Sequence, residues 1–349
     1  MYEREVLDPV PSPIKDGDVA AGTWARAFEE VDLLSIRRPF AWPLPRWMRD
    51  CRIKEWQAFI VQDDNFYLEM ALINVKYLRM AQVSLYDKNT KEQLRFKKII
   101  PLGGWLLPTE LYNSSISSRS YGFYFRIHDW LDADMVKVDL DIEATRKRPS
   151  FTAHLEFDMD RTKTTPLVVN LLFAEKRPLY VYKGFSSVRG DMVFGGRHVS
   201  FNPSQACGIF TDYKGFYPYR MISTWCTAFG FDPDNRSFGF SIVENQAKES
   251  FKNNENALWI DGAITYLPPV RITMPEGPES DWVIQDLEGM VDLTFTPIEK
   301  SKQMFSIILA STDRHSAQGY YNGVLVNSKG ENIQVRNLWG LGEDIYFRI

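Results

Sequence analysis

The sequence predicts an all-β protein with two antiparallel β-barrels or sandwiches packed together and few short helices. Apolar and polar residues alternate with the two-residue period of half-buried strands. Glycine-containing turns separate these runs, and the strand–helix–strand rhythm of a parallel fold is not found. The length of 349 residues exceeds what one hydrophobic core usually reaches, so we expect two packed units.

Two segments show the alternation most clearly. In MVKVDLDIEA, residues 135–144, apolar side chains occupy every second position and charged side chains the positions between them. MVDLTFTP, residues 290–297, repeats the pattern. Strands with one polar face belong to antiparallel sheets, because parallel strands are usually covered on both faces.

Tight turns connect many of these strands. The pair Asp261-Gly262 in WIDGAITYL is a type I′ hairpin signature. Gly195-Gly196 and Gly330 mark two further turns.

The first 53 residues differ from the rest of the chain. Residues 1–23 are rich in proline and glycine and predict an extended arm, and WARAFEEVDLL, residues 24–34, predicts a short helix. Strand patterns begin near Glu55. We therefore expect an N-terminal arm and strap over 1–53, a first barrel over 54–178 and a second barrel over 179–349.

The boundary between the barrels is placed where FAEKRPLYVYKG, residues 173–184, interrupts the alternation. In the second half, ISTWCTAFGFD, residues 222–232, is compatible with either a short helix or a strand.

The composition limits the functional classes. The net charge is −4, so no global basic field favours nucleic acid, and no nucleic-acid partner is expected. Aromatic residues make up 14% of the chain, which fits a β-rich core, an aromatic-lined cavity, or both.

Residues 37–56 form a local basic and aromatic segment. A strap across the fold is the favoured interpretation, and a peripheral membrane contact is the alternative. Pro39, Pro43 and Pro45 exclude one continuous amphipathic helix here.

The cysteines and the N-terminus predict a cytoplasmic protein. Cys51, Cys207 and Cys226 have no CxxC spacing and fit reduced thiols better than a disulfide framework. The N-terminus has no apolar signal-peptide region, and no apolar run approaches membrane-spanning length.

Asp212 is the first candidate catalytic residue. It lies in TDYKGFYPYR, residues 211–220, which we expect to be a rigid irregular segment that forms one wall of a cavity. Desolvation by the surrounding aromatic rings would raise the pKa of the carboxyl, as a general acid requires. The alternative is a structural role, in which Asp212 bonds turn amides or pairs with Lys214 or Arg220.

Glu255 and Glu244 are the candidate partners of Asp212. On a strand, Glu255 shares a face with Trp259, and Glu244 has the parity of the apolar residues Phe240 and Ile242. Acid–base chemistry would require two of these carboxylates to face one cavity. Either glutamate is also compatible with a position where its strand emerges into water.

Five residues are candidates for substrate binding. Aromatic side chains with polar groups can form apolar walls, and an arginine can clamp an anionic group. The same rings are equally compatible with core packing. The candidates are Tyr217, Tyr219, Arg220, Trp225 and Trp259.

No cofactor or metal is expected. The four histidines show no metal-ligand spacing, and phosphate-loop, dinucleotide and nucleophile-elbow motifs are not found. The oligomeric state is left open.

Several segments resemble the domain of unknown function 2804 family. Its N-terminal signature resembles residues 53–92, and its second signature resembles FTDYKGFYPYRMISTWCTAFG followed by NNENALWIDGAITYL. The closing LWGLGEDIYFRI is similar to its C-terminal strand. Two departures are Lys214, where the family has arginine, and Cys226, where a second aromatic is common.

The resemblance implies a lipocalin-like, two-barrel fold related to carotenoid hydratases and fungal Diels–Alder cyclases, and it implies no catalytic residues. Three functions compete. The first is a cofactor-independent hydratase, lyase, isomerase or cyclase that acts on a small, largely apolar molecule. The second is a lipocalin-like carrier of such a molecule, and the third is a scaffold that binds a partner through the strap.

Overall fold

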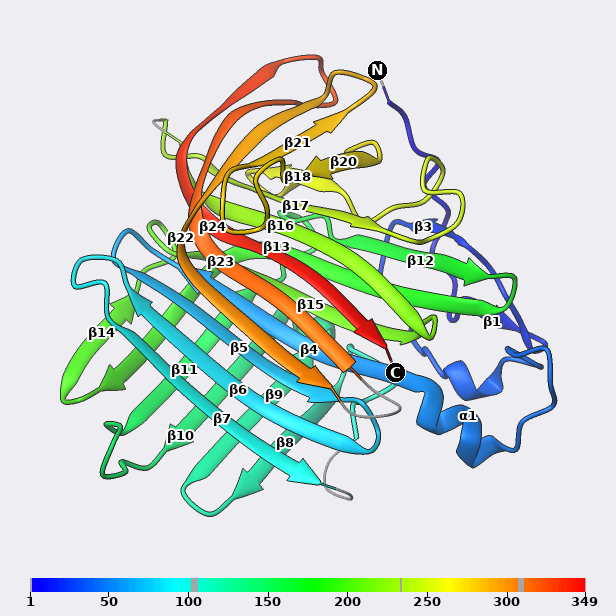
Figure 1. The fold of residues 1–349 in the computed structure, drawn as a ribbon, viewed down its shortest axis with the longest axis horizontal. Coiled ribbons are helices and arrows are strands. Elements are labelled where there is room, and N and C mark those ends of the chain that lie inside the picture. The colour runs from blue at the N-terminus through cyan, green and yellow to red at the C-terminus, as the bar shows by residue number, and fades with distance from the viewer. Residues whose placement is uncertain (1, 102–105, 233, 307–310, 349) are drawn as a thin grey trace.

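Antiparallel β-sheet makes up most of the structure, which confirms the predicted all-β fold. The computed structural model describes residues 2–101, 106–232, 234–306 and 311–348. Two large curled sheets pack on each other, and β22, β23 and β24 of the second sheet cross in front of β4, β5 and β6 of the first (Figure 1).

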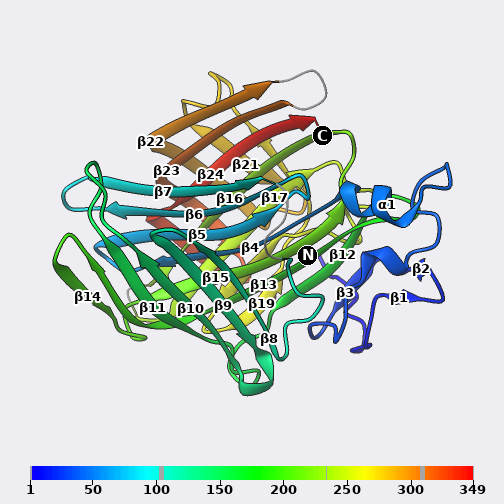
Figure 2. The same ribbon diagram turned by 90° about the horizontal axis from the view of Figure 1, so that it is seen from below.

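The first sheet has 13 strands and curls around its own core (Figure 2). Its main path runs in the order β7 (Gln93–Pro101), β6 (Leu78–Asp87), β5 (Phe66–Asn74), β4 (Ile53–Gln62), β15 (Cys207–Phe216), β13 (Arg177–Phe194), β11 (Phe151–Asp158), β10 (Met135–Ile142), β9 (Phe123–Trp130) and β8 (Ser114–Ser120). Three further strands lie off this path: β12 (Leu167–Ala174) and β14 (Arg197–Phe201) pair with β13, and β3 (Gly22–Trp24) pairs with β12.

The second sheet has nine strands, all from Arg220 onward. Their order is β19 (Ala263–Tyr266), β18 (Ala257–Ile260), β17 (Ser237–Asn245), β16 (Arg220–Phe231), β24 (Asn332–Arg348), β23 (Ser311–Val326), β22 (Val291–Ser306), β21 (Trp282–Asp286) and β20 (Val270–Thr273). The predicted turn at Asp261-Gly262 connects β18 to β19, with both residues at positive φ as a type I′ turn requires.

Buried apolar side chains form three clusters. One fills the first sheet, one fills the second, and the third lies between the two sheets. The predicted alternation is confirmed in β10, where Val136, Val138 and Leu140 are buried in the first core. It is also confirmed at the start of β22, where Leu293 and Phe295 enter the second core.

β13 and β15 separate the first core from the inter-sheet core. Every residue of β15 is buried, because its even-numbered side chains face the first core and its odd-numbered side chains the inter-sheet core. Polar side chains on β15, and on β13 from Pro178 to Ser186, therefore have no access to bulk water, whichever face they occupy.

The expected irregular structure of residues 211–220 is wrong for most of that segment. Residues 207–216 form the regular strand β15, and β16 starts at Arg220. Gly215 permits close packing and not a bend, since a Cβ there would lie 2.8 Å from Leu179 Cδ1.

Helices are few and short, as expected, but the helix expected over 24–34 is wrong. Trp24 pairs with β12 as part of β3, and only a 3₁₀ turn, η1 (Leu33–Ser35), forms later in the segment. The segment buries Trp24, Phe28 and Val31 against the first core, and this tertiary packing overrides local propensity.

The remaining regular elements are α1 (Arg46–Arg52), η2 (Leu131–Ala133) and the pair β1 (Ile14–Lys15) and β2 (Asp18–Val19). ISTWCTAFGFD, the ambiguous segment, lies in strand β16, apart from its last residue.

The two sheets do not coincide with the expected barrels, 54–178 and 179–349. β13 and β15 belong to the first sheet, and the change to the second sheet falls between Phe216 and Arg220. The outermost residues of the expected domains, Met1 and Ile349, lie outside the described residues.

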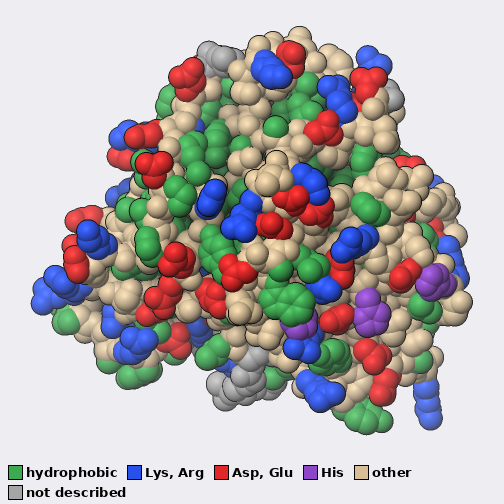
Figure 3. All heavy atoms as spheres, turned by 180° about the vertical axis from the view of Figure 1, so that it is seen from behind, with side chains coloured by type: hydrophobic (Ala, Val, Ile, Leu, Met, Phe, Trp, Pro, Cys, Tyr) green, Lys and Arg blue, Asp and Glu red, His purple; other side chains and the backbone are tan. Residues whose placement is uncertain are grey.

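The N-terminal arm binds the second sheet's loops before it reaches the first sheet. Tyr2 Oη donates to the Phe251 carbonyl at 2.8 Å, and Arg4 Nη1 donates to the Asn254 carbonyl at 2.9 Å. The surface seen from behind intersperses acidic and basic side chains (Figure 3).

The turn of the β18–β19 hairpin packs closely on the backbone of Lys163, and two glycines with nearly equal φ allow this packing to be tested. A Cβ at Gly262 (φ +78°) would lie 2.1 Å from the Lys163 carbonyl oxygen, whereas at Gly330 (φ +79°) it would meet nothing within 4 Å. We expect Gly330→Ala to cost about 1 kcal/mol and Gly262→Ala about 3 kcal/mol of unfolding free energy, measured by urea denaturation. Equal losses in the two variants would contradict this docking.

The thiols should react in two separate steps. All three cysteines are unpaired; Cys51 is exposed and the other two are buried. Burial raises the pKa of Cys207 and raises that of Cys226 to about 12. We expect a thiol reagent to modify one cysteine rapidly in the native protein and all three in denaturant. Rapid loss of two or three thiols without denaturant would contradict the buried positions.

Candidate functional site

Asp212 lies on β15 and faces the first core. Its side chain is fully buried, and Lys214 Nζ, two residues along the same face, lies 2.9 Å from Oδ2. Burial raises the pKa of Asp212, and the Lys214 ammonium opposes that rise. The expected desolvation of this carboxyl is therefore present, together with the expected pairing to Lys214.

Asp129, on β9, is a second fully buried carboxyl that faces the same core. Gln57, the cross-strand neighbour of Asp212 on β4, donates from Nε2 to Asp129 Oδ2 at 2.8 Å. Burial, with a further contribution from the Asp212 charge, raises the pKa of Asp129 to about 8. We call Asp129 and Asp212 the acid pair.

The acid pair leaves hydrogen-bonding capacity unused. Among the described residues, Asp129 Oδ1, Asp212 Oδ1 and Gln57 Oε1 are buried and have no hydrogen-bond partner. Buried polar atoms are normally satisfied, so this concentration marks a place where a polar group of a bound molecule or water fits.

Tyr182 connects the acid pair to a hollow at the rim of the first sheet. It is the cross-strand neighbour of Asp212 on β13, and its side chain also lines a hollow of about 70 Å³. Burial raises the pKa of Tyr182 and of Tyr180, so both phenols are neutral hydrogen-bonding groups. The rest of the lining includes Ala25, Ala27, Tyr112, Leu131 and Met159.

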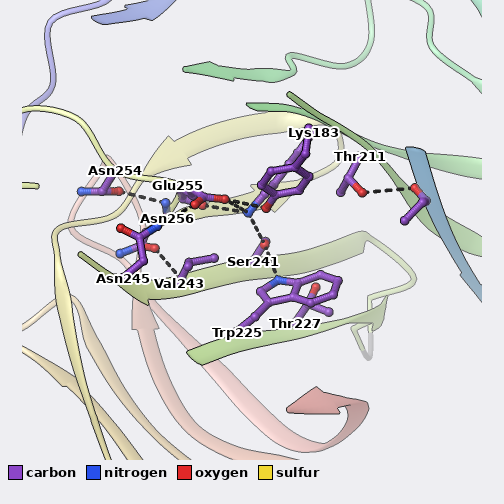
Figure 4. Close-up of polar contacts among 12 residues, drawn as sticks. Lys183, Thr211, Trp225, Thr227, Ser241, Val243, Asn245, Asn254, Glu255 and Asn256 are labelled. Atoms are coloured by element: carbon purple, nitrogen blue, oxygen red, sulfur yellow. Dashed lines mark hydrogen bonds and ion pairs between the residues drawn. The ribbon is translucent and has the colours of Figure 1, made fainter. Parts of the chain in front are cut away.

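Glu255 lies elsewhere, in a polar network between the two sheets (Figure 4). Its carboxylate is 3.3 Å from Lys183 Nζ and accepts hydrogen bonds from Tyr213 Oη at 2.5 Å and Asn245 Nδ2 at 2.8 Å. Lys183 Nζ also donates to Ser241 Oγ at 2.9 Å. We call these residues the inter-sheet network.

The inter-sheet network satisfies its own charges. Burial lowers the pKa of Lys183, and the Glu255 charge opposes that change. Trp225 Nε1 donates to the same Ser241 Oγ at 3.0 Å. A buried ion pair with this many hydrogen bonds fixes the position of one sheet on the other, which is a structural role.

The acid pair and the inter-sheet network occupy opposite faces of β13 and β15. Asp212 and Tyr182 point into the first core, and the adjacent positions Tyr213 and Lys183 point between the sheets. The structure therefore brings Asp212 together with Asp129 and not with Glu255.

Glu244 joins neither group. It lies 2.7 Å from Arg271 Nη1 and accepts a hydrogen bond from the Ile272 amide at 2.7 Å, near the edge of the second sheet. Glu244 therefore lies where the end of strand β17 emerges toward water.

The candidate binding residues are also dispersed. Tyr217 packs in the inter-sheet core, Trp225 joins the inter-sheet network, and Trp259 is fully buried with Nε1 donating to the Thr165 carbonyl at 2.9 Å. Tyr219 and Arg220 are exposed. Within the part of the chain that the structure describes, none of the five forms a hydrogen bond or ion pair with Asp129 or Asp212.

Sequence reasoning missed Asp129 and Gln57, although a signal for each was present. Asp129 has the parity of Phe123, Phe125 and Ile127, and it is therefore an acid on the apolar face of a strand. Gln57 has the parity of Phe59 and Val61. Polar residues at core positions of strands are uncommon and usually have a polar partner or a function. Here the two residues are hydrogen-bonded to each other.

The acid pair has the composition of an acid–base site. Burial raises the pKa of both carboxyls, to about 8 for Asp129, and of the two only Asp212 has the Lys214 ammonium at hydrogen-bond distance to oppose the rise. No group of three or more histidine, cysteine or acidic side chains is placed to hold a metal ion within the described parts of the chain.

Solved structures share this fold at low sequence identity. A structure of CghA is 11% identical, covers 97% of this chain and 95% of its own, and has a TM-score of 0.58. CghA with Sch210972 is 10% identical over 85% of this chain and 88% of its own, with a TM-score of 0.55. Kievitone hydratase from Nectria haematococca is 11% identical over 84% of this chain and 88% of its own, with a TM-score of 0.46. At these identities the CghA structures show a common fold and nothing further.

The sequence comparisons identify a family. No match is found among curated proteins. The family model described as "Domain of unknown function (DUF2804)" matches residues 3–348, and the chain therefore belongs to the DUF2804 family.

Proposed function

We propose that the protein is an acid–base enzyme of the hydratase, lyase, isomerase or cyclase type, acting on a small, largely apolar molecule. The observation that carries the proposal is the acid pair, in which two fully buried carboxyls share one glutamine and leave oxygen atoms unpartnered within the described residues. Because the two carboxyls supply both an acid and a base, the chemistry requires no cofactor.

The roles follow from the surroundings of each carboxyl. Asp129, with a pKa of about 8, is the acid that holds a proton at neutral pH. Asp212, with Lys214 Nζ at 2.9 Å, is the carboxylate that takes one. With a carbonyl substrate, Asp212 removes the proton from the neighbouring carbon while Asp129 protonates the oxygen, which gives an enol and exchanges the protonation states of the two residues.

Entry to the acid pair is proposed from the rim hollow, past Tyr182. A volume of about 70 Å³ holds only a few water molecules, so a substrate requires movement of the segment containing Ala25 and Ala27. Ala25 is exposed, whereas Phe28, which follows in the same segment, is buried in the first core.

A carrier is less compatible with the same residues. A pocket for an apolar passenger avoids buried ionisable groups, since each costs free energy unless it is paired. Here three of them, Asp129, Asp212 and Lys214, are buried together in the first core.

The first test uses 2-cyclohexen-1-one in D₂O, with NMR to follow deuterium incorporation at the carbons activated by the carbonyl. We expect exchange catalysed by the protein, and a loss of at least about 100-fold in Asp212→Asn and in Asp129→Asn. The wild-type rate should fall above about pH 8, where Asp129 loses its proton. Asp141→Asn, at an exposed position of β10, is the matched control and should keep the wild-type rate.

Two results would contradict the proposal. One is the same exchange rate in buffer and in wild-type protein. The other is undiminished exchange in both acid-pair variants, with native circular dichroism for each variant.

The second test measures stability against pH. The pKa of Asp129 is about 8 in the folded protein and near 4 when unfolded, so the folded state binds its proton more tightly. Its contribution is fully present below about pH 4 and is lost as the pH rises through about 8. We expect the Asp129 carboxyl to lower wild-type stability by on the order of 3 kcal/mol between about pH 5 and about pH 8, and Asp129→Asn to remove this component of the total fall.

Denaturant unfolding at the two pH values provides the measurement, and Asp141→Asn should keep the wild-type slope. An Asp129→Asn protein that loses as much stability as wild type would show that Asp129 is ionised in the fold.

A further inference from the structure

Helix α1 and the loop before it expose large hydrophobic side chains. None of the residues of α1, all of which the structure describes, is buried. Trp42 is 79% exposed and Trp47 is 68% exposed, and Met48 lies beside them with 38% exposure. Tryptophan is normally well buried in a folded protein, so two exposed indoles within six positions point to a binding surface.

The same segment carries a dense positive charge. Residues 37–52 contain five arginines and one acid, Asp50, whose carboxylate lies 3.0 Å from Lys76 Nζ. The chain as a whole has a net charge of −4, and acidic and basic side chains intersperse over the back of the molecule. The positive field is therefore local to this segment.

A hollow of about 410 Å³ lies between this segment and earlier residues of the arm, which include Asp16 and Gly17. Arg37, Arg38, Arg49 and Trp42 contribute to its lining. Arg49 Nη1 donates to the Ile36 carbonyl at 2.8 Å, while its Nε has no hydrogen-bond partner among the described residues. The lining supplies guanidinium groups suited to phosphate or carboxylate oxygens.

Two exposed tyrosines extend the aromatic surface toward the sheets. Tyr77 is 49% exposed and has Lys54 Nζ 5.1 Å from its ring centre, and Tyr219 is 47% exposed immediately before β16. Lys54 Nζ also donates to the Cys51 carbonyl in α1, and Phe216, three residues before Tyr219, pairs with Ile53 directly after α1, so both tyrosines lie near the end of this helix. Figures 1 and 2 both show α1 projecting from one end of the molecule. We call residues 37–52 with Tyr77 and Tyr219 the strap surface.

We infer that the strap surface docks on a bilayer that contains anionic lipids. Tryptophan and tyrosine rings favour the level of the lipid headgroups, and arginines beside them bind headgroup phosphates and carboxylates. Each arginine near an anionic leaflet contributes favourably, and the exposed indoles add buried apolar area. Among the described residues, no helix has both the length and the apolarity to cross a bilayer.

Pro39, Pro43 and Pro45 restrict the loop before α1, which lowers the entropy that docking would remove. An exposed segment held in this way presents its aromatic and cationic groups together without first folding on its target.

The test is co-sedimentation of the full chain with vesicles of phosphatidylcholine alone, and of phosphatidylcholine and phosphatidylserine in a three-to-one ratio. We expect binding to the mixed vesicles, with weakening as salt is added. The variant Arg38→Glu/Arg46→Glu should lower the partition coefficient by at least about tenfold. Trp42→Ala/Trp47→Ala should lower it by about tenfold as well.

Two controls make comparable changes on other surfaces, one in net charge and one in exposed aromatic area. Arg146→Glu/Lys147→Glu, in the exposed turn between β10 and β11, makes an equal change in net charge, and Tyr121→Ala removes a ring that is 94% exposed. Both should bind as wild type does.

The inference is overturned if wild type does not sediment with the mixed vesicles, or if the double arginine variant and its control bind equally. It is also overturned if Trp42→Ala/Trp47→Ala leaves vesicle binding intact while it converts a dimer to a monomer in light scattering. In that case the strap surface binds a second copy of the chain.

Discussion

The position of β13 and β15 between two hydrophobic cores is the constraint on which the rest of the structure depends. A strand at the edge of a fold can turn polar residues toward water, but β15 and the part of β13 from Pro178 to Ser186 cannot. Each polar side chain in these parts must find its partners inside the protein. The acid pair lies on one side and the inter-sheet network on the other, separated only by the thickness of a sheet.

The two polar groups meet that constraint differently. In the inter-sheet network, Lys183 and Glu255 have partners for their charges, as expected where the geometry is purely structural. In the acid pair, oxygen atoms of Asp129 and Asp212 have no partner in the described protein. The hydrogen-bonding groups of the inter-sheet network have partners, as in a structural site. Those of the acid pair do not all have partners, and this difference makes the acid pair the candidate reactive site.

The fold class could be predicted because period-two alternation and glycine turns are local properties of the sequence. Asp212 could be selected because an acid among aromatic residues is unusual. Its partner could not be selected, because Asp129 is 83 positions away and approaches only when β9 and β15 curl around the same core. Glu255 is selected as a partner on the parity of its own segment, which it shares with Trp259, but the parity of β15 assigns Asp212 to the opposite face.

The domain boundary and the helix over 24–34 were misjudged for a related reason. Both depend on which sheet a segment joins, and that is decided by contacts between distant strands and not by local pattern. The hairpin at Asp261-Gly262 was predicted correctly because its backbone geometry is encoded in the two turn residues themselves.

The contacts of the N-terminal arm have a consequence for the order in which the protein folds. Tyr2 binds the carbonyl of a residue 249 positions later, and the β4–β15 pairing joins residues such as Ala58 and Thr211, 153 positions apart. A ribosome therefore releases the arm and β4 long before their partners exist, and β4 to β7 must wait with an unpaired edge. Folding of such a topology is slow, and the waiting strand edge is open to other chains. Exposure of this strand edge during synthesis therefore follows from the connectivity of the sheets and is independent of the stability of the finished fold.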